Sequence, residues 1–422
     1  MERYGKNAYA LMEKLNYVRV AGTDGENRAA DTIDEALRAM GISSSRESFE
    51  IDAYEIKTAR LTVTAPFEAE YAITGYGLSG STGPDGIRAP FLYAEDGDEI
   101  TLAKAKGKIV LLNGHVSPDQ YAKIVKAGAV GFITISGTLL DEYDKTDLEL
   151  RTLRAERHLK NGEIGKIPGV SIRAKDALAM LKREPEEVAI TLIQEEKKAI
   201  SQNIIAEIEG GDLKDEWITF GAHYDTVPFS PGMYDNASGS AIILEVIRHF
   251  ATHRPRRSLR FIWFGAEEKG LLGSLYHVRQ NPEEIKQTRL MINVDLAGLV
   301  IGAHHARVSA EESVCSVVRF LAQEIGFGMT VTQDIYSSDS EPYADAGVPA
   351  ISFYRGGPTG GHSRNDVIEP VSAKSLEAST RFCIHFSERL INSEVFPVPW
   401  AVPEKIKEKL EVYFGRKSTE MK

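Results

Sequence analysis

Histidine and acidic residues recur in this chain where short apolar runs give way to loops. One such run is followed by His223 and Asp225, and a loop that contains glycine and proline then leads to Asp235. The complete set comprises His223, Asp225, Asp235, Glu267, Glu268, Asp295 and His362. Imidazole and carboxylate groups are the ligands expected of zinc, cobalt or manganese rather than calcium, and they also move protons in catalysis. The sequence therefore predicts a metal site with acid–base chemistry.

The candidate ligands are too many for one ion. A catalytic zinc ion takes three protein ligands and a water, whereas two imidazoles and three carboxylates are available here, besides one glutamate of the pair Glu267-Glu268. Five ligands fit two divalent ions that share a bridging carboxylate, and a bridging hydroxide would bring this cluster to neutrality. The remaining glutamate could then act as a general base.

The spacing of His223 and Asp225 indicates a supporting contact. Residues two apart on an extended chain lie on the same face. Asp225 could therefore accept a hydrogen bond from one imidazole nitrogen of His223 while the other nitrogen binds a metal, as is usual for histidine ligands.

Alternating strand-like and helix-like segments must position these residues. Strands are predicted over 203–210, 217–226, 258–265, 290–298 and 349–354, and helices over 237–249, 271–279, 312–325 and 374–390. This alternation predicts an α/β fold, with a mixed, mostly parallel sheet and helices on both faces. Ligands bind beyond the carboxyl ends of the strands in such sheets, and the candidate residues fall there.

The ordered set of motifs resembles a known family. His-Tyr-Asp-Thr at 223–226, Asp235-Asn236, Glu267-Glu268, the run that ends at Asp295, and Gly-His-Ser around His362 are similar in order to motifs of the co-catalytic zinc exopeptidases of metallopeptidase family 28, mostly aminopeptidases. The resemblance covers about 200–370, and the Arg-x-Ala-Gly-Thr run at 19–23 with the helix predicted over 26–40 looks like the opening of that family.

The resemblance implies a zinc exopeptidase-like fold and a ligand set. His223 and Asp295 would bind one zinc ion. Glu268 and His362 would bind the other, and Asp235 would bridge the two ions. Co²⁺ or Mn²⁺ could replace zinc.

The resemblance also implies catalytic roles. Glu267 would deprotonate a water that bridges the two ions and pass the proton to the leaving amine, while Asp225 would orient His223. The family often has a tyrosine just before the last histidine or near the Ser-Asp run, but the residue before His362 in this chain is Gly361. The donor that would stabilise the transition state is therefore unassigned, with Tyr336 as a candidate.

The expected domain organisation is discontinuous. Segments at 106–114, 126–133 and 167–172 resemble a protease-associated domain inserted into the catalytic fold. We expect a catalytic domain over 1–56 and 197–395, a β-rich protease-associated insert over 57–196, and a C-terminal tail with a short helix over 396–422. Within the insert, Ser117-Pro118 is expected to begin a helix, and the charged stretch 141–163 is expected to be a solvated loop or helix face.

Composition limits the partners. The 422 residues are 42% hydrophobic and 26% charged, as in ordinary globular proteins, and the formal net charge of −11 disfavours nucleic acid and anionic lipid. The sequence has neither an apolar run of ~18 residues that could span a membrane nor the apolar core of a signal peptide. We expect peptide substrates and a cytoplasmic location, or secretion if a precursor segment was removed. The insert and the C-terminal helix are both candidate surfaces for a homo-oligomer.

Two other features are expected to be structural. Cys315 and Cys383 lie in helix-like apolar stretches, which predicts buried, reduced thiols. His304-His305 could line a cleft, but an exposed loop is the preferred interpretation.

The sequence predicts a metal-dependent exopeptidase, most simply a zinc aminopeptidase that hydrolyses N-terminal residues from peptides. A carboxypeptidase or a glutaminyl cyclase-like transferase on the same scaffold is an alternative, and the cyclases use a single zinc ion. A catalytically silent binding protein of the same fold is a third hypothesis. Such relatives have typically lost ligands, whereas all five ligands and the base are present here.

Overall fold

The computed structural model describes residues 3–141, 148, 150–153, 159, 164–358 and 360–417. The chain divides into two compact units, Met1–Ile51 with Ile200–Lys422, and Asp52–Ala199. The predicted insert, 57–196, lies within the range of the second unit. Most of the predicted charged loop over 141–163 lies outside the described residues.

The first unit is built on a mixed sheet whose strands follow the order β13-β12-β14-β11-β9-β10-β8. These are β8 (Glu187–Ile208), β9 (Leu213–His223), β10 (Arg257–Phe264), β11 (Thr288–Val294), β12 (Ala303–Ser309), β13 (Met329–Thr332) and β14 (Ala350–Gly356). The four central strands, β14, β11, β9 and β10, are parallel. Strand β8 runs antiparallel to β10, and β12 runs antiparallel to β14 but parallel to β13. The predicted fold class is therefore confirmed.

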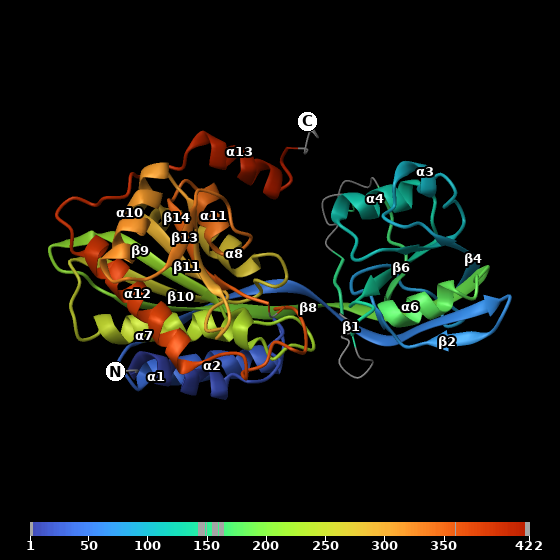
Figure 1. Cartoon of the computed structure of the whole chain (residues 1–422), viewed down its shortest axis with the longest axis horizontal. Helices are drawn as coiled ribbons and strands as arrows, with labels where there is room; N and C mark the ends of the chain where they lie inside the picture. The colour runs from blue at the N-terminus through green and yellow to red at the C-terminus, as the bar shows by residue number, and fades with distance from the viewer. Residues whose placement is uncertain are drawn as a thin grey trace. The chain divides into compact units, whose positions relative to one another are not determined.

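Helices cover both faces of this sheet (Figure 1). Strand β10 shows why, because alternate side chains of a strand point to opposite faces: Phe261 and Trp263 pack into one core, and Ile262 and Phe264 into the other. The first core is completed by α1 (Arg3–Lys14), α2 (Asp24–Arg38), α7 (Ser238–Phe250), α10 (Glu312–Glu324) and α12 (Ala373–Ile391). The second is completed by α8 (Leu272–Gln280), α9 (Pro282–Gln287), α11 (Ser340–Asp345) and α13 (Glu404–Tyr413). The helices predicted in this unit all exist within two residues of their predicted ends.

The registry of the central strands brings their carboxyl ends to one edge. His223 is paired with Phe264 across β9 and β10, and Gly221 is paired with Asn293 across β9 and β11. The loops that follow these strands therefore emerge side by side, and they carry the predicted ligands.

The second unit contains further strands of the sheet order and two hydrophobic cores. Its strands follow the order β3-β7-β6-β5-β4-β8, and β4 to β7 are parallel. They are β3 (Ile73–Gly75), β4 (Ile87–Tyr93), β5 (Ile109–Leu112), β6 (Gly131–Ser136) and β7 (Gly169–Arg173), with β1 (Ser44–Ala65) paired to β2 (Ala69–Tyr71). Among the residues described in this unit, helices are found at α3 (Glu99–Leu102), α4 (Pro118–Lys126) and α6 (Ala174–Leu181). Ser117 caps α4 as predicted, by accepting a hydrogen bond from the amide of Gln120. The resemblance of this unit to a protease-associated domain stays a prediction.

Several elements differ from expectation. Strand β8 begins at Glu187, well before the predicted start at 203, because charged residues at 195–198 point to solvent in the middle of the strand and interrupt the apolar pattern. His304 and His305 lie on β12, paired with Arg355 and Tyr354, and not in an exposed loop. The sequence did not predict β12 as a strand, because one face of this strand is only partly covered and carries polar residues.

The remaining expectations concern the cysteines, the tail and membrane segments. Cys315 and Cys383 are free and buried, as predicted. Helix α13 in the tail packs Ile406 and Leu410 into the second core of the first unit. Among the described residues, no helix is both long and apolar enough to cross a membrane.

Candidate metal centre

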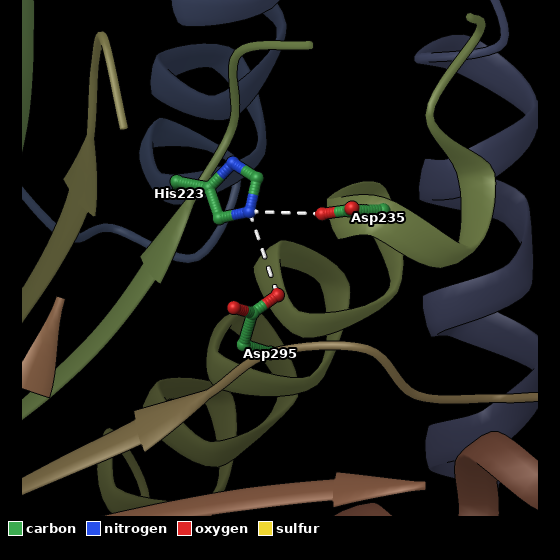
Figure 2. Close-up of side chains that lie close together, drawn as sticks. All are labelled: His223, Asp235 and Asp295. Atoms are coloured by element: carbon green, nitrogen blue, oxygen red, sulfur yellow. Dashed lines mark ion pairs between the residues drawn. The ribbon is translucent and has the colours of Figure 1, made fainter. Parts of the chain in front are cut away.

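The first predicted ligand group gathers around His223, the last residue of β9. Asp295 follows directly after β11, and Asp235 lies in the short turn Met233–Ala237 (η1) that precedes α7. Nε2 of His223 is 3.1 Å from Oδ1 of Asp235 and 3.4 Å from Oδ1 of Asp295. All three side chains are buried. Figure 2 shows this imidazole edge directed at both carboxylates.

A second group forms on the other oxygen of Asp235. Nε2 of His362, in the loop after β14, is 3.2 Å from Oδ2 of Asp235 and 3.0 Å from Oε2 of Glu268. In each group the candidate ligand atoms lie within 4.8 Å of one another. Asp235 is thus common to both groups, with one carboxylate oxygen facing each.

Hydrogen bonds of the Asp366 and Asn236 side chains fix the main chain around Asp235. The carboxylate of Asp366 accepts hydrogen bonds from the amides of Tyr234, at 2.6 Å, and Asp235, at 2.9 Å. Asn236 donates to the carbonyl of Val294, next to Asp295, at 2.9 Å. These bonds link Asp235 to the loops that carry the neighbouring candidate ligands.

Gly361 lies against the carboxylate of Asp235. A Cβ atom at this position would come within 2.5 Å of Oδ2 of Asp235. The absence of a side chain lets the loop that carries His362 approach Asp235 this closely. The departure from the Tyr-His pattern of the family therefore has a steric reason.

Asp225 and Glu267 connect two strand ends. Oδ1 of Asp225 is 3.5 Å from Nδ1 of His223, which is longer than an ordinary hydrogen bond. The carboxylate of Asp225 instead accepts from the amides of Glu267, at 3.1 Å, and Glu268, at 3.3 Å. A carboxylate oxygen of Glu267 lies in one compact group with ligand atoms of His223 and Glu268. Asp225 thus fixes the turn that presents both glutamates, and its orienting effect on His223 stays a prediction.

The charges of the site shift the pKa values of both histidines upward. Burial lowers the pKa of His223, but Glu267 and the adjacent aspartates raise it well above its ordinary value. Hydrogen-bond contacts with Asp235 and Glu268 raise the pKa of His362 to about 11. Among the described residues, carboxylates face both imidazoles and favour their charged, doubly protonated form.

The acidic groups shift in opposite directions. Burial opposes the ionisation of Asp235, yet contacts with His223 and His362 hold its pKa below the ordinary value. Burial raises the pKa of Glu267 well above the ordinary value, and neighbouring carboxylates add to this against the charge of His223. Burial also raises the pKa of Glu268. Burial thus opposes the charge of Glu267 and Glu268, whereas the two imidazoles favour the anion of Asp235.

The donor set fits two divalent cations. Each group offers one imidazole nitrogen and carboxylate oxygens, which suit zinc, and Oδ1 of Asp295 is buried without a hydrogen-bond partner. Buried carboxylates need compensating positive charge. Protonated imidazoles provide some of it here, and metal ions would replace those protons.

Tyr336, the candidate transition-state donor, lies in the loop between β13 and α11. Its ring stacks on that of Tyr354 with centroids 4.7 Å apart. Burial, followed by the charges of Asp295 and Asp235, raises the pKa of its hydroxyl. The hydroxyl therefore stays protonated at neutral pH, within electrostatic range of the first ligand group.

The structure brings together all seven predicted site residues. Sequence reasoning missed the supports of the site, above all Arg19 and Asp366. Both contact the main chain next to Asp235 from more than 100 positions away in the sequence, where no local pattern indicates a partner. The Arg-x-Ala-Gly-Thr run pointed to this segment, but not to a role for its arginine.

Comparisons with known proteins agree with this architecture. The model of peptidase family M28 matches residues 203–387. Aminopeptidase YwaD of Bacillus subtilis is 30% identical over 398 residues, which cover 88% of this chain and 82% of that protein. The structure of BSAP, a zinc aminopeptidase from Bacillus subtilis, aligns with a TM-score of 0.76 at 27% identity, and covers 96% of this chain and 98% of that chain.

A more distant structure shows the same fold. The aminopeptidase from Aneurinibacillus sp. strain AM-1 aligns with a TM-score of 0.74 at 24% identity, over 94% of this chain and 96% of that chain. The alignments extend over nearly the whole chain, beyond the segment matched by the family model. On this similarity in sequence and fold, the chain belongs to peptidase family M28.

Proposed function

We propose that this protein is a two-zinc aminopeptidase that hydrolyses N-terminal residues from peptides. The observation that carries the proposal is Asp235, whose two carboxylate oxygens each face a separate histidine–carboxylate group. The names of two similar proteins, aminopeptidase YwaD and the zinc aminopeptidase BSAP, support both the metal and the reaction.

The chain's own residues define where two ions fit. His223, Asp235 and Asp295 would hold the first, and Asp235, Glu268 and His362 the second. Two zinc ions, when bound, would acidify a shared water and polarise the carbonyl of the scissile peptide bond. Cobalt or manganese ions suit the same donors and could substitute.

Glu267 is the proposed proton carrier. It is not needed to complete either ligand group, it lies beside both His223 and Glu268, and its raised pKa suits a group that accepts and then releases a proton near neutral pH. It would take a proton from the attacking water and donate it to the nitrogen of the leaving amine. Tyr336 would donate a hydrogen bond to the oxyanion.

A panel of matched substrates tests the reaction. Leucyl-p-nitroanilide and Leu-Gly should be cleaved, whereas their N-acetylated forms should not. EDTA should abolish cleavage, and added Zn²⁺ should restore it. Cleavage of N-acetylated peptides at their C-terminus would indicate a carboxypeptidase instead. Cyclisation of N-terminal glutamine without hydrolysis would indicate a cyclase, and full activity in EDTA would contradict the proposal.

A further inference from the structure

Arg19 is a fully buried arginine close to the metal centre, in the loop between α1 and α2. In the part of the chain that the structure describes, all hydrogen bonds of its guanidinium go to main-chain carbonyls. The acceptors are the carbonyls of Leu15, Tyr17, Tyr224, Pro231 and Gly232. A buried guanidinium is costly unless its donors are satisfied. These carbonyls satisfy the donors of Arg19, and their positions indicate what the buried side chain does.

Three of these carbonyls belong to the chain segments that present predicted site residues. Nε of Arg19 donates to Tyr224, which lies between His223 and Asp225, at 2.8 Å. The terminal nitrogens donate to Pro231 at 2.6 Å and to Gly232 at 3.0 Å, shortly before Asp235. One side chain therefore ties the end of β9 to the loop that carries the bridging residue.

The backbone around Arg19 is shaped to admit this contact. The amide of Arg19 donates to Oγ1 of Thr226 at 2.9 Å, and the amide of Thr226 donates to the carbonyl of Arg19 at 3.2 Å. Gly232 adopts a φ of +57°, and a Cβ atom there would come within 2.4 Å of Thr226 and 3.2 Å of the guanidinium. The guanidinium and the loop are thus closely fitted.

Asp366 holds the same loop from another side, since it accepts the amides of Tyr234 and Asp235. Arg19 therefore binds carbonyls before Asp235, and Asp366 binds the amides at Asp235. The positive charge of the guanidinium also interacts electrostatically with the carboxylates of Asp366, Asp225 and Asp235. Lysine could not reproduce this arrangement, because it has three donors on one nitrogen instead of five in a planar fork.

We propose that Arg19 is the positioning residue of the metal centre: it fixes the Pro231–Gly232 loop against the end of β9, so that Asp235 presents one oxygen to each ligand group. Arg19 contacts neither substrate nor ion in this role. The proposal rests on the two-zinc site of the proposed function. Since Asp235 would serve both ions, loss of Arg19 should weaken both binding steps.

The test compares Arg19→Lys and Arg19→Met with a matched control, Arg257→Met. Arg257 is 2% exposed and also donates to three main-chain carbonyls, at Leu390, Ile391 and Ser393, besides an ion pair with Glu216 at 2.7 Å. It lies at the first residue of β10, roughly 23 Å from the end of that strand near the metal centre. The control therefore removes a comparable set of hydrogen bonds without disturbing the ligand loops.

Two quantities are measured for each protein: the zinc dissociation constants, by competition with a chelating dye, and the thermal unfolding of the metal-free protein. We expect both Arg19 variants to raise both dissociation constants by about 10- to 100-fold, the range for groups that support metal ligands. Arg257→Met should lower the unfolding temperature and leave both constants unchanged. At saturating zinc, Arg19→Lys should recover most of its activity, because Arg19 does not touch the reacting atoms.

The outcomes separate this proposal from the proposed function. If the unmodified protein binds fewer than two zinc ions, the proposed function fails. If it binds two, and Arg19→Lys binds them as tightly while only its unfolding temperature falls, Arg19 supports the fold alone and this inference is overturned. Arg19→Lys decides the matter even if Arg19→Met does not fold.

Discussion

Asp235 makes the two ligand groups depend on each other. Its oxygens lie 3.1 Å and 3.2 Å from the imidazoles of His223 and His362, one on each side. A change in the position of this residue therefore affects both groups. Asp366 holds the turn that presents this residue, by accepting hydrogen bonds from its main-chain amides.

The role of Glu267 can be separated from metal binding. Glu267→Gln keeps the size of the side chain but removes the base, so we expect zinc content to stay unchanged and turnover to fall by about 10²- to 10⁴-fold. Zinc analysis and kcat on leucyl-p-nitroanilide measure both effects. Glu268→Gln is the matched control, since it should weaken zinc binding as well. Loss of zinc from Glu267→Gln would assign this residue to the ligands instead.

The raised pKa values of the histidines predict a proton-linked metal affinity. His362 has a pKa of about 11, and that of His223 is also raised. Both are charged in the metal-free protein at pH 7, but they must be neutral to bind zinc. Zinc binding should therefore release protons, and affinity should rise with pH between about 6 and 9.

Calorimetry in buffers of different ionisation enthalpy measures the released protons. We expect at least two protons for two zinc ions at pH 7, because each group contains one charged imidazole. The folding stability of the metal-free protein should depend on pH in the opposite direction to zinc affinity. The stabilisation by charged His362 is complete below its ordinary pKa and declines as pH rises towards about 11. Binding enthalpies that do not depend on the buffer would show that the imidazoles are neutral before zinc arrives.

At the scale of elements, the strands that lead to the candidate ligands are supported by the helices that pack against the sheet. Phe264 ends β10 two residues before Ala266 and belongs to the same core as Ile406 and Leu410 of α13. The C-terminal helix therefore helps to build the core below the strand that leads to Glu267 and Glu268.

Truncation of this helix face should reduce stability strongly. Ile406 and Leu410 are 0% exposed, whereas Val412 in the same helix is 37% exposed. We expect Leu410→Ala to lower the free energy of unfolding by about 2–5 kcal/mol, as for other buried leucines, and Val412→Ala to change it by less than about 0.5 kcal/mol. Urea unfolding of the metal-free protein measures both. Equal effects of the two substitutions would mean that α13 does not pack as described.

The central elements could be predicted because their apolar periodicity is strong. Strands such as β10, which is buried along its whole length, and helices such as α12 have clear patterns. Strands β1 and β8 could not be delimited, since each runs for 22 residues through partly exposed, charged stretches. Ion pairs such as Lys198 with Asp52 occupy positions where an apolar alternation would otherwise mark the strand.

For the whole molecule, the clustering of the candidate ligands could be predicted from the sequence, but the residues that support them could not. His223 ends an apolar strand, and Glu268 and Asp295 follow two others, so the fold itself brings them to one edge. Arg19 is more than 200 residues from the loop that it holds, and its partners are main-chain carbonyls, which have no sequence signature. A buried arginine that binds backbone is visible only in three dimensions.

The stoichiometry of zinc is the most direct test of the account. Metal-free protein is titrated with Zn²⁺ while bound metal and hydrolysis of leucyl-p-nitroanilide are followed together. The account predicts two ions per chain, with activity that depends on both, and Asp235→Asn should impair both binding steps. A single ion per chain at full activity, or unimpaired binding of two ions by Asp235→Asn, would contradict it.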